Sequence, residues 1–106
     1  MQKIIDETEE RAFAFLKEFG FSNDEIAPVV AKGIFDLENT CDKLKILFND
    51  FSEEKLDELD DLLHGLKGLL VQLGNTPLAE AIEKLRDYEN IESLHDRMNE
   101  ILFLEA

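Results

Sequence analysis

Apolar residues recur at intervals of three and four along almost the whole chain, which is the spacing of an amphipathic helix. No stretch alternates apolar and polar residues as a half-buried strand would. Stripes of this kind joined by loops of a few residues are typical of up-down bundles. We therefore predict a single all-α domain: an up-down antiparallel four-helix bundle with an additional N-terminal helix that covers one end. The predicted helices lie over 4–19 and 77–88, with further apolar stripes over 26–51, 56–73 and 91–102, and the domain spans 1–106.

Residues that favour helix ends mark several of the boundaries. Gly74 is expected to stop the third helix. Ser22 and Glu25 have the three-residue spacing of a capping box, so the second helix should begin there. Pro28 follows soon afterwards, and because proline lacks a backbone N–H we expect either a kink or a restart of the helix at this position.

The stripes also predict which side chains are buried. Cys41 lies in the stripe of the second helix, so we expect a small buried hydrophobe rather than a reactive thiol. Phe19 belongs to the stripe at the end of the first helix, and Phe48 and Phe51 continue the stripe of the second. All three phenylalanines are therefore predicted to face the core.

The charge of the chain limits its partners. It carries 25 acidic and 11 basic residues, a formal net charge of −14. Nucleic acids and anionic membranes repel such a surface, because both attract proteins mainly through Lys and Arg. We therefore expect protein partners, with no nucleic acid and no membrane. Whether the acidity steers those partners or only keeps the protein soluble stays open.

Location and cofactors follow from what the sequence lacks. No apolar run approaches the roughly 20 residues needed to cross a bilayer, and the first residues do not resemble a signal peptide. With one cysteine no internal disulfide can form, so a reducing cytoplasm is the expected location. The acidic run at 57–61 sits on a predicted helix and lacks the pattern of a calcium loop. We expect a monomer with no bound metal or cofactor.

His64 stands out because it lies on the polar side of a helix whose other side is lined with leucine. These leucines fall within an arc of about 100°, and His64 points roughly 130° away from its centre. Gly65 and Gly68 share the solvent side, although each glycine costs about 1 kcal/mol relative to alanine in a helix interior. Lys67 follows one turn after the histidine. The predicted result is a histidine on a bare helix surface that another protein's active site can approach.

An exposed histidine of this kind suits phosphoryl transfer, because neutral imidazole is nucleophilic near pH 7. Lys67 can screen the charge of an incoming phosphate. His95, by contrast, has no lysine or glycine beside it. We expect His95 to be an ordinary surface histidine.

The run His64-Gly65-Leu66-Lys67-Gly68, followed by Gly74, resembles the histidine-containing phosphotransfer (HPt) domain of two-component phosphorelays. The pattern of that family is His-x-x-Lys-Gly with a second glycine six residues later. The resemblance covers roughly residues 30–104. It implies a four-helix bundle whose histidine is phosphorylated on Nε2.

The resemblance also implies the partners and the division of labour. His64 would exchange its phosphoryl group with the aspartate of a response-regulator receiver domain, free or within a hybrid histidine kinase. Lys67 would support the phosphate and Gly68 would give steric access, with Gly65 extending the bare surface. The catalytic aspartates and Mg²⁺ would belong to the receiver. The chain is thus expected to be a phosphocarrier in signal transduction rather than an enzyme.

Two features depart from the family pattern. Leu69 and Val71 stand where small residues are often found, and they could form an apolar docking rim. Arg86 lies 22 residues after the histidine, where many relatives have Gln or Glu near the imidazole. Arg86 either reinforces phosphate binding or pairs with Glu83 or Asp87.

Two alternatives to a free-standing phosphocarrier stay open. An acidic helical adaptor or inhibitor would keep the bundle and dock on a signalling partner without carrying phosphate. Phe35 and Ile46, beside the second stripe, either close the ends of the core or belong to a partner-binding patch of this kind. The chain could also be part of a larger kinase, although its starting methionine and its set of helices favour a free-standing protein.

Overall fold

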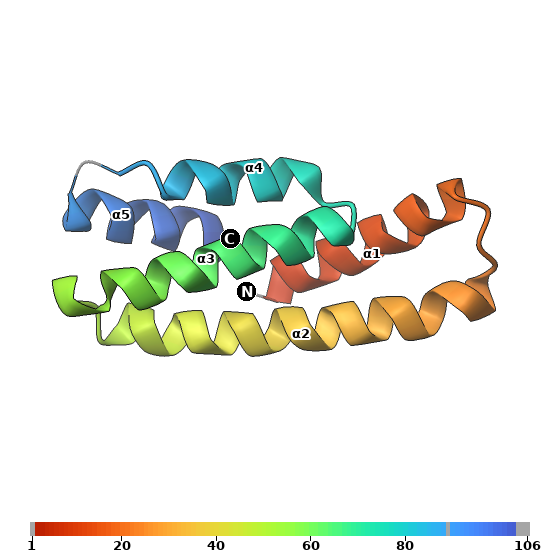
Figure 1. Cartoon of the computed structure of the whole chain (residues 1–106), viewed down its shortest axis with the longest axis horizontal. Coiled ribbons are helices and arrows are strands. Elements are labelled where there is room, and N and C mark those ends of the chain that lie inside the picture. The colour runs from red at the N-terminus through yellow and green to blue at the C-terminus, as the bar shows by residue number, and fades with distance from the viewer. Residues whose placement is uncertain (1, 89, 104–106) are drawn as a thin grey trace.

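All regular structure in the part of the chain that the computed structural model describes, residues 2–88 and 90–103, is helical (Figure 1). The all-α class is therefore confirmed. Short loops separate the helices, and a π-helical turn continues the last one. The elements are α1 (Gln2–Glu18), α2 (Asn23–Asn49), the 3₁₀ turn η1 (Glu53–Lys55), α3 (Leu56–Gln72), α4 (Thr76–Leu85), α5 (Ile91–Met98) and η2 (Asn99–Phe103).

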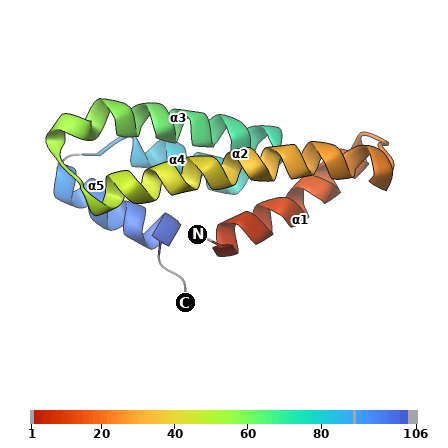
Figure 2. The same ribbon diagram turned by 90° about the horizontal axis from the view of Figure 1, so that it is seen from below.

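The helices lie side by side along the length of a molecule that measures 45 × 27 × 20 Å. α3 runs back along α2, and α4 packs against α3 in turn (Figures 1 and 2). α1 packs against α2 near the end where α3 turns into α4, whereas α5 lies toward the opposite end of the molecule (Figure 1). α3 thus has neighbours in both α2 and α4, and this placement fixes which of its faces is buried.

The buried face of α3 is the predicted leucine stripe. Leu59, Leu63, Leu66 and Leu70 expose 2% of their surface or less. Cys41 on α2 is likewise buried, as the stripe of that helix predicts. Fully burying a leucine stabilises the fold by roughly 1.5–3 kcal/mol. The orientation of α3 is therefore held firmly, and the polar residues between its leucines must face outward.

Of the three phenylalanines predicted to face the core, Phe19 does not. Phe19 is 66% exposed, because α1 ends one residue before it and its ring packs edge-to-face on Phe15. Phe48 and Phe51 are partly buried and pack against the core as predicted, and Leu47 at the end of α2 is buried as well.

Phe35 and Ile46 are exposed on α2, at 59% and 69%. Neither residue can therefore close an end of the core. The other interpretation, a partner-binding patch, stays a prediction.

The predicted cap of α2 is present, and α5 is capped as well. Glu25 N–H donates to Ser22 Oγ at 3.3 Å, and Ser22 N–H donates to the Glu25 carboxylate at 3.1 Å, which completes the capping box. α2 continues through Pro28 without a break, so a restart there is wrong. The fixed φ of proline suits a helix, and near the N-terminus its missing N–H removes a single bond. At α5, Ser93 N–H donates to Asn90 Oδ1 at 2.8 Å.

The turn between α3 and α4 ties α1 to the rest of the molecule. Gly74 has φ +77°, the left-handed conformation that ends many helices, and the N–H of Asn75 donates to Leu70 O at 2.8 Å. A Cβ on Gly74 would lie 2.5 Å from Phe15 Cγ on α1. The buried side chain of Asn75 donates to Thr8 Oγ1 on α1, also at 2.8 Å.

Candidate functional site

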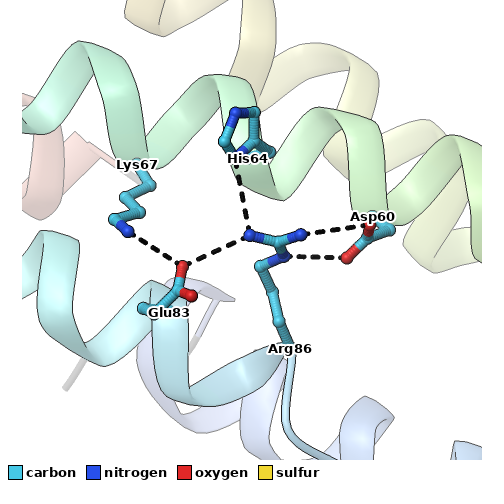
Figure 3. Close-up of polar contacts among 5 residues, drawn as sticks. All are labelled: Asp60, His64, Lys67, Glu83 and Arg86. Carbon is cyan, nitrogen blue, oxygen red and sulfur yellow. Dashed lines mark hydrogen bonds and ion pairs between the residues drawn. The ribbon is translucent and has the colours of Figure 1, made fainter.

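α3 presents His64 to solvent at the middle of its length. Three of its buried leucines, at 59, 63 and 66, fix the rotation of the helix, and His64 is exposed between them. This position agrees with the prediction from helical spacing. Figure 3 shows the imidazole on α3, with one ring nitrogen directed toward the guanidinium of Arg86.

Gly65 and Gly68 leave the helix surface bare beside the histidine. Among the described residues, a Cβ built on either glycine would have no atom within 4 Å other than those of its chain neighbours and its own helix backbone. Packing within this part of the chain therefore does not require glycine at either position. Nearby, Val71 is 49% exposed and Leu69 is partly buried, so both can contribute to an apolar rim.

Arg86 reaches across from the end of α4 to the histidine. It is the C-cap residue of α4, which ends at Leu85 rather than at the predicted residue 88. Its Nη1 atom lies 3.4 Å from His64 Nδ1, whereas the second ring nitrogen points away from the guanidinium (Figure 3). Arg86 is thus one of the residues that the fold brings to the candidate site.

Asp60, one turn before His64 on α3, holds the guanidinium in place. Arg86 Nε donates to Asp60 Oδ1 at 2.8 Å, and Nη2 donates to Oδ2 at 3.3 Å (Figure 3). Such a two-pronged contact fixes the plane of the guanidinium. The hydrogen bonds from Arg86 lower the pKa of the Asp60 carboxyl, and the same contact raises the pKa of Arg86.

Glu83 links the two cations of the site. Its Oε2 atom lies 3.1 Å from Lys67 Nζ and 3.4 Å from Arg86 Nη1 (Figure 3). The hydrogen bond from Lys67, with a further contribution from Arg86, lowers the pKa of Glu83. The predicted pairing of Arg86 with Glu83 is therefore present. The carboxylates of Asp60 and Glu83 thus balance the positive charges of Lys67 and Arg86 beside His64.

Sequence reasoning missed Asp60, which carries the strongest contacts of Arg86. Its signal was an acidic residue four positions before the histidine, on the same helical face. That spacing could not reveal a partner on α4, because the partner depends on how the two helices pack. The predicted site residues His64, Lys67 and Arg86 lie together where α3 meets the end of α4 (Figure 3). Gly65 and Gly68 are exposed on the same stretch of α3.

His95 is not the ordinary surface histidine that was predicted. It is partly buried, and its ring stacks on Phe48 with centroids 4.1 Å apart and an angle of 10° between the planes. Phe51 contacts the same ring edge-on at 5.4 Å. Phe48 and Phe51 themselves pack against the core, so the environment of His95 differs from that of the exposed His64.

Comparisons with models of protein families, with curated proteins and with solved structures found no match. Within residues 2–88 and 90–103, no helix has both the length and the apolar character needed to span a membrane. Among these same residues, no group of three His, Cys, Asp or Glu side chains is arranged to hold a metal ion.

Proposed function

We propose that this chain is a histidine phosphotransfer protein that accepts a phosphoryl group on His64 Nε2 and passes it to a partner. The partners would be response-regulator receiver domains, free or within a hybrid histidine kinase. In this proposal α2 to α5 form the four-helix bundle of an HPt domain and α1 is an addition to it. The protein would act as a cytoplasmic monomer, without kinase activity and without a cofactor of its own.

The transfer itself needs one nucleophilic atom from this chain. The Nε2 lone pair of His64 attacks the phosphorus of an aspartyl phosphate on the receiver. An N–P bond forms, the P–O bond to the aspartate breaks, and the carboxylate leaves with the bonding electron pair. The reverse reaction delivers the phosphoryl group to a receiver. Catalytic groups that assist the attack and the departure would come from the partner.

One observation carries the proposal: His64 is exposed on a stretch of α3 where two glycines leave no side chains beside it, and the cations Arg86 and Lys67 lie nearby. Arg86 lies 3.4 Å from the imidazole, and Lys67 lies one turn further along the same helix. A phosphoryl group adds about two negative charges to a chain whose net charge is −14. Nearby cations would lower the free energy of that phosphorylated form.

The bare surface at Gly65 and Gly68 supports the same function. Receiver domains hold their aspartate among other catalytic groups, so the imidazole must enter that site for transfer to occur. Larger side chains at these two positions would stand between the two proteins. No contact within the described part of this chain requires glycine at either position, so access by another protein is the physical reason that we propose for them.

Phosphate uptake tests the proposal. The purified protein is incubated with the radiolabelled, phosphorylated receiver domains of its source organism, and the phosphate that it gains is tested for acid lability and mapped by mass spectrometry. We expect acid-labile, alkali-stable phosphate on the peptide that contains His64. The absence of such phosphate with every receiver of the organism would overturn the proposal and would favour the adaptor alternative.

A further inference from the structure

The contact with Arg86 favours one tautomer of the His64 imidazole. A guanidinium stays protonated throughout the physiological pH range and can only donate hydrogen bonds. The atom that it approaches, His64 Nδ1, must therefore act as an acceptor and present its lone pair. Gln or Glu, which many members of the resembled family carry at this position, could instead accept a hydrogen bond from Nδ1–H.

The tautomer of the imidazole follows from this contact. A neutral imidazole has one N–H, so a lone pair on Nδ1 places the proton on Nε2. In that tautomer the Nε2 electron pair belongs to the aromatic ring and cannot attack phosphorus. The arrangement around Arg86 thus stabilises the tautomer that is unreactive at the nitrogen where phosphorylation is proposed.

Two carboxylates keep the guanidinium at this position. Asp60 binds it with two hydrogen bonds, at 2.8 and 3.3 Å, and Glu83 contacts Nη1 at 3.4 Å (Figure 3). The Arg86 side chain is 29% exposed, so it is partly packed against its surroundings. Its contact with His64 is therefore part of a network that spans α3 and α4, rather than the chance position of a free side chain.

We infer that Arg86, anchored by Asp60, is a positioning residue that holds His64 as the Nε2–H tautomer until a phosphodonor docks, and that slows both charging and loss of phosphate. This inference rests on the proposed function and adds a control on the same histidine. Charging requires the Nε2 proton to move to solvent and Nδ1 to become protonated, which displaces the Arg86 contact. The released Nε2 lone pair can then form the N–P bond as the aspartyl P–O bond breaks.

The same contact protects the phosphorylated form. Hydrolysis of Nε2-phosphohistidine breaks the N–P bond while water attacks the phosphorus, and the electron pair of that bond stays on Nε2. This departure is easiest when Nδ1 carries a proton, because the neutral imidazole is then the leaving group. A guanidinium beside Nδ1 opposes that protonation by charge repulsion and by occupying the lone pair. Arg86 is thus expected to prolong the lifetime of the phosphohistidine.

Nitrogen NMR on the unphosphorylated protein tests the inference directly. Long-range proton–nitrogen spectra of ¹⁵N-histidine-labelled protein distinguish a ring nitrogen with a lone pair from one with a proton, at a pH where titration shows the imidazole to be neutral. We expect the Nε2–H tautomer of His64 to dominate in the unchanged protein. In Arg86→Gln the ratio of Nε2–H to Nδ1–H should fall several-fold, and Asp60→Asn should lower it by a smaller factor.

Matched controls separate this effect from a general structural change. Asp61→Asn removes an exposed carboxylate one residue along α3, and Arg97→Gln removes an arginine from α5; both should leave the His64 tautomer ratio unchanged. His95 serves as the internal reference, and its nitrogen signals should be the same in all variants. A dominant Nδ1–H tautomer in the unchanged protein, or a ratio that Arg86→Gln does not alter, would overturn the inference.

The outcomes keep the inference apart from the proposed function. The NMR measurement involves no phosphate and no partner. If His64 takes up phosphate but exists mainly as Nδ1–H, the phosphocarrier function stands and the role given to Arg86 is wrong. If His64 takes up no phosphate, the proposed function fails whatever its tautomer, and the control of phosphate charging fails with it.

Discussion

Nη1 of Arg86, at the end of α4, lies 3.4 Å from Nδ1 of His64, in the middle of α3 (Figure 3). The two residues are 22 positions apart in sequence, and only the packing of α4 against α3 brings them together. Of the alternatives that the sequence left open for Arg86, the pairing with Glu83 is present. Arg86 also stands beside the histidine that we propose to carry phosphate, and its role in phosphate binding stays a prediction.

Replacing Gly68 with Gln separates a carrier from an adaptor. A Cβ at this position would meet no side chain within 4 Å in the described part of the chain, so the variant should gain some tenths of a kcal/mol from helix propensity. It should nevertheless slow phosphate transfer severalfold by crowding the approach to His64. Thermal unfolding and transfer rates check the two effects. A variant that is more stable and equally fast would mean that the bare surface has no role in docking.

Removing the cations beside His64 should destabilise its phosphorylated form. Lys67→Ala and Arg86→Ala are each expected to speed phosphohistidine hydrolysis or to shift the transfer equilibrium back toward the receiver. The effect should be several-fold, as for other exposed charge pairs, and larger at low salt. Lys84→Ala, on the exposed side of α4, is the control. Unchanged lifetimes and equilibria in both variants would show that neither cation acts on the phosphate.

Thr8→Val should destabilise the protein although it nearly preserves the size of the side chain. The buried amide of Asn75 donates to the Thr8 hydroxyl at 2.8 Å and would lose this acceptor. An unsatisfied buried donor costs about 1–3 kcal/mol. Thr40→Val on α2, which removes only a bond to the carbonyl of its own preceding turn, should have a smaller effect. Equal losses in urea denaturation would contradict the role given to the Thr8–Asn75 contact.

Burial makes Cys41 a source of pH-dependent stability. Loss of solvent raises the pKa of its thiol from the ordinary 9.0 to about 11. The folded state therefore holds this proton more tightly than the unfolded state, and stability should fall as the pH rises from about 9 toward 11. Cys41→Ala should unfold with a weaker pH dependence over this range. Identical slopes for the two proteins in chemical denaturation would contradict the assignment.

The helices and most of the predicted site could be read from the sequence because both depend on local spacing. The leucines of α3 fix its buried face, so the exposure of His64 follows from an offset along one helix. The capping box at Ser22 and Glu25 involves residues three positions apart, and it forms as predicted.

The parts that sequence reasoning missed are contacts between helices. Asp60 binds Arg86 across α3 and α4, Thr8 accepts from Asn75 across 67 positions, and His95 stacks on Phe48. The residues adjacent to each of these in the sequence give no indication of the contact. The partner depends on how two helices are rotated and shifted relative to each other, and the periodicity of a single helix carries no information about either.

The most direct test of the central claim is to measure whether a His64→Gln variant still gains acid-labile phosphate. Gln keeps the size and polarity of the side chain but removes the nucleophilic nitrogen, so phosphate uptake from a receiver that charges the unchanged protein should vanish while helicity is retained. His95→Gln is the matched control and should take up phosphate as the unchanged protein does. A His64→Gln variant that is folded and still gains acid-labile phosphate would contradict the account.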